Sequence, residues 1–272
     1  SDVYKRQTLD GTTYKTDGVT IFEAAAGNTI LLTGASPTIT TMNDNLTFDG
    51  GNIVLSTAGT TTIDTELGGS GGGNVLIDGT INGTDGENEA LVINGGSGSV
   101  TVNGAIGATN PLTTITIGSA GAGTVEVTNI GGGSAGASGA TAIGNTNTGT
   151  LTLDGTVYNT GDTQTYTAAT GGGNIDITGA ATFTTSADNI AFNTSGVDLV
   201  ASVAITTGTG TNAGNISFGG AIEAGNAGTQ TLTIDSGSGS VTFTGAIGLT
   251  NALGGLNVCL LYTSPSPRDG HQ

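Results

Sequence analysis

Apolar residues recur along most of the chain in a short alternating pattern. Glycine and a second small residue are followed by apolar–x–apolar, as in Gly73-Asn74-Val75-Leu76-Ile77 and Gly98-Ser99-Val100-Thr101-Val102. Strict alternation over three to five residues, between clusters of Gly, Asn and Thr, is typical of short β-strands. The apolar residues show no helical spacing. The pattern therefore predicts an all-β chain.

The motif returns at a nearly constant interval. It begins at Gly51, Gly73, Gly98, Gly123, Gly149 and Gly173, and again at Gly214 and Gly239. The wider gap before Gly214 fits two short units, with Gly196-Val197-Asp198-Leu199 between them. Three short strands in each unit of about 22–26 residues predict a parallel, right-handed β-helix (β-solenoid) of roughly ten coils.

A longer repeat supports this architecture. The segment 91–110 recurs without a gap at 232–251. The main structural alternative is an antiparallel sandwich, which needs a hairpin turn about every 8–12 residues. A sandwich has no reason to keep a constant period, so the β-helix is the favoured fold.

The β-helix makes a specific prediction about packing. The first apolar residue of each motif should be buried and stacked along one axis, at about 4.8 Å per coil. These residues are Ile53, Val75, Val100, Val125, Leu151, Ile175, Ile216 and Val241. Gly and Asn are expected at corners with positive φ. Only 4% of the residues are aromatic, which indicates a thin core without stacked rings.

Composition and charge exclude several classes of partner. The chain has 51 glycines and only 9% charged residues, and its net charge is −17. Such an acidic chain lacks the basic footprint that nucleic acids or anionic lipids require. No apolar run approaches the roughly 20 residues of a membrane-spanning helix. We therefore expect neither nucleic-acid binding nor membrane insertion of this segment.

Both ends of the chain read as translated sequencing adapter. Asp2–Gln7 back-translates to the transposase end sequence used to tag sequencing libraries, and Cys259–Ser264 back-translates to its reverse complement. Residues 1–7 and 259–272 are therefore interpreted as adapter-derived, and 8–258 as the repeat segment, an internal fragment of a longer polypeptide. The only cysteine and the only histidine then carry no biological meaning, and Lys15 is the one basic residue of 8–258.

Candidate chemistry is sparse. Asp85, Glu87 and Glu89 alternate between two predicted strands and are the weak candidates for Ca²⁺, or for a catalytic carboxylate pair. A solvated corner is the simpler interpretation. The glycine runs 68–73 and 131–133 lack the lysine and helix of a phosphate-binding loop. The sequence thus predicts no catalytic, cofactor-binding or metal site and no enzyme activity.

Outward-facing threonines raise a second possibility. Thr101, Thr152 and Thr242 occupy the middle of apolar–x–apolar strands, where a regular hydroxyl array would favour ice binding. The same slot holds other residues in other units, which breaks any regular array. These residues are Val54, Leu76, Glu126, Asp176 and Ser217.

Two phrases resemble the repeats of large bacterial surface proteins. They are Gly-Ser-Val-Thr-Phe-Thr-Gly-Ala-Ile-Gly at 239–248, with its counterpart at 98–107, and Asn159-Thr160-Gly161-Asp162-Thr163-Gln164-Thr165-Tyr166. In these phrases the chain is similar to filamentous-haemagglutinin-like adhesins and related β-strand-repeat exoproteins. The resemblance implies secretion across a Gram-negative envelope and display on the outer surface.

The function expected from the resemblance is that of a non-catalytic, adhesive stalk. Its partners would be the neighbouring coils of the same polypeptide, together with surface glycans or a host receptor. A polysaccharide-binding or polysaccharide-degrading β-helix, and an ice-binding β-solenoid, remain as alternatives. An enzyme of this fold would need a base for proton abstraction, and only carboxylates and Lys15 are available in 8–258.

Overall fold

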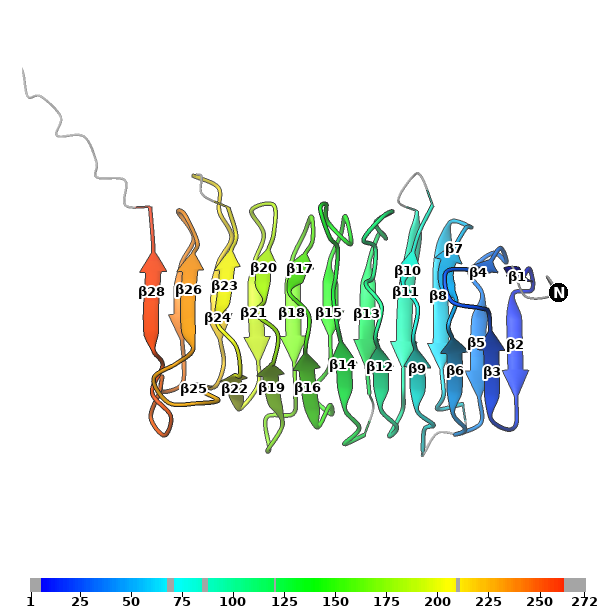
Figure 1. Cartoon of the computed structure of the whole chain (residues 1–272), viewed down its shortest axis with the longest axis horizontal. Helices are drawn as coiled ribbons and strands as arrows, with labels where there is room; N and C mark the ends of the chain where they lie inside the picture. The colour runs from blue at the N-terminus through cyan, green and yellow to red at the C-terminus, as the bar shows by residue number, and fades with distance from the viewer. Residues whose placement is uncertain (1–5, 68–70, 85–87, 120, 209–210, 262–272) are drawn as a thin grey trace, which may run out of the picture.

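The protein is a straight stack of β-coils. A computed structural model describes residues 6–261 except 68–70, 85–87, 120 and 209–210. The described residues form 28 strands and no helix. In Figure 1 the coils follow one another along the long axis in sequence order, from blue to red.

The strands form three faces of the stack. Face A consists of a four-stranded sheet, β1 (Arg6–Leu9), β4 (Thr29–Leu32), β7 (Asn52–Leu55) and β10 (Ile81–Asn82), and a five-stranded sheet, β17 (Val157–Asn159), β20 (Thr182–Thr184), β23 (Val203–Thr206), β26 (Thr231–Asp235) and β28 (Gly255–Cys259). Isolated parallel bridges through Ile81, Ile106, Ile130 and Tyr158 join these two sheets.

Face B is one ten-stranded sheet, and face C has nine strands. Face B contains β2 (Thr13–Thr16), β5 (Thr38–Thr41), β8 (Gly59–Asp64), β11 (Glu89–Asn94), β13 (Ile115–Gly118), β15 (Thr141–Ile143), β18 (Gln164–Thr167), β21 (Ile190–Asn193), β24 (Ile216–Phe218) and β27 (Val241–Phe243). Face C contains β3 (Thr20–Glu23), β6 (Leu46–Asp49), β9 (Val75–Ile77), β12 (Val100–Val102), β14 (Val125–Val127), β16 (Thr150–Leu153), β19 (Asn174–Ile177), β22 (Gly196–Leu199) and β25 (Ala221–Ala224).

The chain visits faces A, B and C in turn, and each strand pairs with the strand one coil earlier or later. All pairings between these strands are parallel. The predicted parallel β-solenoid of about ten coils is therefore confirmed, and the antiparallel sandwich is excluded.

The predicted single column of apolar residues is only partly correct. Val75, Val100, Val125, Leu151 and Ile175 do stack in register on face C, and all five are buried. The other three members of the predicted column lie on different faces. Ile53 pairs with Ile30 and Ile81 on face A, whereas Ile216 and Val241 pair with each other on face B.

The long internal repeat shows the same change of face. Leu91–Ile93 lies on face B, but its later counterpart Leu232–Ile234 lies on face A. The interval between the two copies therefore does not correspond to a whole number of coils. The two copies can occupy different faces because the same motif fits each of them: an apolar–x–apolar strand with inward apolar side chains, followed by a small corner residue.

Coil length varies more than the motif spacing indicates. One coil runs from Ile177 to its register partner Leu199, whereas a clearly longer one runs from Ile63 to Ile93. The longer coil contains the long connection between β8 and β9. Insertions are accommodated at such corners because they do not disturb the strand ladders on either side.

Other glycines, such as Gly50 and Gly107, have the positive φ expected at corners, but the glycines that begin the recurring motif are required by close packing instead. A Cβ on Gly98 would lie 2.3 Å from the carbonyl oxygen of Gly73, and one on Gly123 would lie 2.0 Å from that of Gly98. Neither glycine has positive φ. Successive coils thus approach each other at this corner too closely for any side chain.

Asparagine at the corners also acts differently from the expectation. Among the described residues, Asn43 is the only asparagine with positive φ. The others use their side chains: Asn74 Oδ1 accepts a hydrogen bond from the backbone N–H of Ser99, one coil later, at 2.9 Å. Asn215 Oδ1 accepts one from the N–H of Ser240 at 2.8 Å. Asparagine therefore continues the hydrogen-bond ladder around the bend.

The expectation of a core without stacked rings is wrong. All nine aromatic residues of 8–258 make ring contacts. Four of them, Tyr166, Phe192, Phe218 and Phe243, stack in register under face B, with centroids 4.8–5.4 Å apart. Rings fit a narrow core because each lies parallel to the ring of the next coil.

Gln164 and Tyr166, from the phrase that resembles exoprotein repeats, are core residues. Both are buried, and the Tyr166 hydroxyl donates to Gln164 Oε1 at 2.9 Å. Gln164 Nε2 donates in turn to the carbonyl oxygens of Tyr158 and Thr184. Burial raises the pKa of Tyr166 well above its ordinary value. These residues thus satisfy backbone groups inside the solenoid.

The last coil leaves apolar side chains and a strand edge uncovered. Among the described residues β28 pairs only with β26, and Leu256 and Val258 on it are exposed. An open strand edge is a template for association. We expect end-to-end association that increases with protein concentration, and also with salt because salt screens the repulsion between chains of charge −17. Sedimentation across a salt series tests this; a monomer at high concentration and high salt would contradict it.

Candidate ligand-binding surfaces

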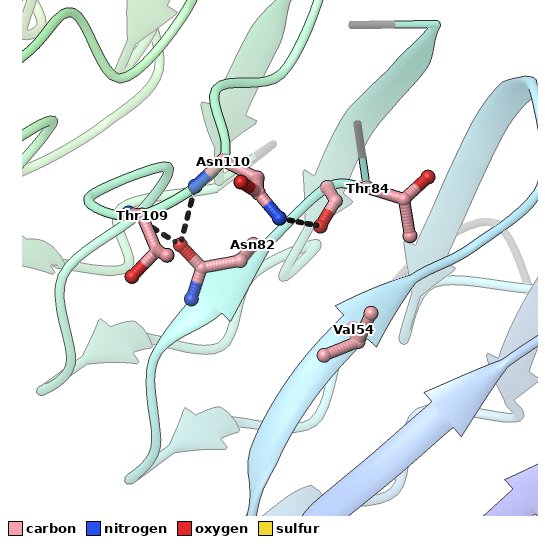
Figure 2. A pocket seen from close by; sticks show the side chains of 6 residues that line it. Val54, Asn82, Thr84, Thr109 and Asn110 are labelled. Atoms are coloured by element: carbon pink, nitrogen blue, oxygen red, sulfur yellow. Dashed lines mark hydrogen bonds between the residues drawn. The ribbon is translucent and has the colours of Figure 1, made fainter. Parts of the chain in front are cut away.

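One hollow lies over face A (Figure 2). Its volume is about 310 Å³, and it is lined by Val54, Asn82, Gly83, Thr84, Thr109 and Asn110. Asn82 is the register partner of Val54 one coil later, because β10 pairs with β7. The loop that contains Thr109 and Asn110 belongs to the next coil, so the hollow is a step between coils.

The polar groups of this hollow are bonded to one another. Asn82 Oδ1 accepts the backbone N–H groups of Thr109 at 2.9 Å and of Asn110 at 3.4 Å. Asn110 Nδ2 donates to the carbonyl oxygen of Gly83 at 3.4 Å. Figure 2 shows these bonds joining the loop of Thr109 and Asn110 to Asn82 and Gly83 of the preceding coil. These bonds hold adjacent coils in register, and Asn82 Nδ2 donates in turn to the Thr80 hydroxyl at 3.1 Å.

A second hollow, on face C, has the same construction. Its volume is about 280 Å³, and its lining includes Asn45, Asn74 and Ser99. Asn45 Oδ1 accepts the N–H of Asn74 at 2.8 Å, which continues the asparagine ladder described above. Both hollows are therefore shallow corners of the stack, with the amide and hydroxyl groups that neutral polar ligands recognise.

Of the three predicted acidic candidates, only Glu89 lies within the described residues; Asp85 and Glu87 lie outside them. Glu89 is not the solvated corner residue of the simpler interpretation, because only 3% of it is exposed. Its Oε1 accepts the Thr84 hydroxyl at 2.5 Å, and its Oε2 accepts the N–H of Asn88 at 3.2 Å. The carboxylate thus ties the loop before β11 to that strand.

Face C carries a row of carboxylates that the sequence pattern did not reveal. Asp176, Asp198 and Glu223 are register partners on β19, β22 and β25, and Glu126 lies on β14. Glu223 accepts the backbone N–H groups of Leu249, Thr250 and Asn251, so it caps a turn. Among the described residues, no three His, Cys, Asp or Glu side chains are grouped closely enough to hold a metal ion.

Asp176 and Asp198 share a hydrogen-bond donor. Asn174 Nδ2 donates to both carboxylates, at 2.8 Å to Asp198. Burial raises the pKa of Asp176, and the charge of Asp198 raises it further, whereas the Asn174 hydrogen bond lowers it. Since the folded-state pKa exceeds the ordinary value of 3.8, ionisation of Asp176 costs folding free energy as pH rises through that pKa.

We therefore expect Asp176→Asn to stabilise the protein at pH 7. The gain should be a few tenths to about 1 kcal/mol, as for like charges directly opposite on paired strands. It should vanish below about pH 3.8, where both folded and unfolded forms are protonated. Denaturant unfolding at both pH values measures it. Glu126→Gln is the matched control, because its partners Thr101 and Thr152 are uncharged; an equal gain there would contradict the prediction.

None of the protein-family models, curated proteins and solved structures compared with the chain matches it. In the described part of the chain no helix is long and apolar enough to cross a membrane. The geometry of the stack itself is thus the basis for functional inference.

Proposed function

We propose that the chain is a structural segment of a large secreted bacterial surface protein, where it serves as an adhesin stalk. The observation that carries this proposal is the stack itself: about ten coils follow one another through parallel pairing on three faces, and isolated bridges link the two sheets of face A. In such a solenoid each coil contacts only its neighbours, so length grows with coil number without a wider core. That property suits a rod that holds a binding region away from a cell.

Two further features support the proposal. The phrases at 98–107, 159–166 and 239–248 resemble exoprotein repeats, and Gln164 and Tyr166 of the second phrase contribute to the core. The hollow around Asn82 and Asn110 is lined by amide and hydroxyl groups, the kind of groups that surface glycans or a host receptor could contact. We assign no catalytic residue and no cofactor, and we place the segment outside the cell.

The experiment combines export with a change of length. The chain, fused behind the secretion region of a Gram-negative exoprotein, should reach the medium in folded form. Deleting 117–191 joins positions in register, because Ile117, Ile143, Tyr166 and Phe192 stack on face B. Three coils are lost, so the maximum dimension from X-ray scattering should fall by roughly 14 Å. A deletion of equal size, 127–201, is the control, because it joins positions that are out of register.

Several outcomes would overturn the proposal. Retention of the folded chain inside the cell would argue against the exoprotein assignment. An unchanged maximum dimension after the in-register deletion would argue against the rod. Turnover of pectin, alginate or a similar polysaccharide, abolished by changing Asp85, Glu87 or Glu89, would establish an enzyme instead.

A further inference from the structure

Face B carries an unbroken column of small, uncharged side chains on its outer surface. One residue from each of its ten strands is in register with the next, and in eight of these strands it lies between two buried neighbours. The column consists of Thr13, Thr38, Thr62, Val92, Thr116, Ala142, Thr165, Ala191, Ser217 and Thr242. We refer to these ten residues as the face B ladder.

A second column runs beside the ladder, two residues earlier in each strand or in the turn before it. Its members are Thr60, Ala90, Thr114, Ala140, Thr163, Asn189, Asn215 and Ser240. Backbone hydrogen bonds continue through these positions; for example, the N–H of Leu91 donates to the carbonyl oxygen of Thr114, and that of Gln164 to Asn189. The two columns together form a two-dimensional array of hydroxyl, methyl and amide groups without a single ionisable side chain.

The sequence alone does not reveal this array, because the middle positions of the motif fall on different faces of the solenoid. In the sequence, the middle slot of the apolar–x–apolar motif mixes threonine with Val54, Glu126 and Asp176. The structure places Val54 on face A and the two acids on face C. Thr116 and Thr165 of face B thus have no acidic neighbours in their column, although the chain as a whole has a net charge of −17.

The surface is also pre-ordered. Tyr166, Phe192 and Phe218 stack directly under it, with interplanar angles of 17° and 6°. Threonine and valine are β-branched and stiff at χ1, and alanine has no rotamers to lose. Binding a rigid lattice would therefore require little further ordering of the protein.

We propose that face B binds ice. The two columns carry no ionisable side chain and repeat at the coil spacing, although Lys15 and Asp64 lie beside the ladder on β2 and β8. A partner that matches the columns is therefore uncharged and regularly repeating. A cationic partner would be attracted to face C, where the carboxylates lie, and an anionic partner would be repelled by it. A crystalline polysaccharide is less well matched, since all aromatic side chains of 8–258 take part in ring contacts and the face B ladder contains none. Hydroxyl and methyl groups at the strand spacing can hold water in a repeating pattern.

The test is partition of the full chain into ice grown slowly from buffer. The wild-type protein should enter the ice, and Thr116→Lys should reduce the partition coefficient about tenfold or more, because a lysine on the flat face is desolvated without a partner. Thr101→Lys is the matched control: Thr101 also lies between two buried residues, but on face C. It should partition like the wild type. Thr165→Lys provides a second position within the face B ladder.

The outcomes separate ice from other occupants of this face. Exclusion of the wild-type protein from ice, or equal losses for Thr116→Lys and Thr101→Lys, would overturn the inference. Two other results would also overturn it: binding of the wild-type protein to insoluble cellulose or chitin, or a wild-type dimer in sedimentation. Either counts if Thr116→Lys abolishes it and the wild-type protein enters ice only weakly. Thermal unfolding of each variant shows whether the fold is retained. Failure here would leave the export and length results of the stalk proposal unaffected.

Discussion

Replacing Phe192 by alanine should lower the free energy of unfolding by about 3–5 kcal/mol, the usual cost of removing a buried aromatic side chain. Its ring is stacked between Tyr166, at 5.3 Å, and Phe218, at 4.8 Å, and it packs edge-on against Phe183. The substitution leaves a cavity in the middle of the ring stack. Because a solenoid is held together by contacts between neighbouring coils, unfolding should also divide into two transitions at this point.

Urea unfolding followed by circular dichroism measures both effects. Phe243→Ala is the matched control, since Phe243 ends the same stack, is only half-buried and contacts a single ring. Its loss should be clearly smaller, and unfolding should remain a single transition. Equal losses for the two variants would mean that the stack does not couple the coils.

Gly155→Ala should be destabilising by about 3 kcal/mol, or should prevent folding, although it adds only one methyl group. A Cβ at this position would lie 1.2 Å from the carbonyl oxygen of Thr128 in the previous coil, so the backbones must separate. The same corner holds the hydrogen bond from the Gly155 N–H to the Tyr158 hydroxyl at 3.0 Å, and that hydroxyl donates to the carbonyl oxygen of Val127. Separation of the coils would break this buried link as well.

Gly171→Ala provides the comparison. A Cβ on Gly171 meets nothing within 4 Å, and its φ is not positive. This variant should unfold within about 0.5 kcal/mol of the wild type, as is usual for surface substitutions. A similar cost at both positions would show that the effect of Gly155→Ala reflects chain flexibility rather than packing between coils.

The fold class could be predicted from the sequence because its signals are local. Alternation over a few residues, as in Val100-Thr101-Val102, specifies a strand with one buried side. The recurring glycine and asparagine specify corners, and the nearly constant interval between motifs specifies coils rather than hairpins. Each of these signals depends on nearby residues alone, which is why the parallel solenoid could be predicted without knowing its register.

The candidate site was less predictable. The alternating acids around Glu89 indicated a solvated loop, but Glu89 is buried and bonded to Thr84. The carboxylate row of face C lies on strands that are a full coil apart in the sequence, so nothing in the local pattern connects Asp176 with Asp198 or Glu223. Burial of a carboxylate and proximity between carboxylates are both properties of the stacked chain.

By itself, the sequence determined that the chain forms short strands, that glycine marks its corners, and that the strands stack in parallel coils. Only the tertiary structure decided which of the three faces each strand joins. Leu91 lies on face B and its repeat Leu232 on face A, because coils of unequal length shift the phase and all three faces accept the same motif. The separation of the carboxylate row on face C from the face B ladder, which carries no ionisable side chain, follows from that accumulated register, which no local pattern encodes.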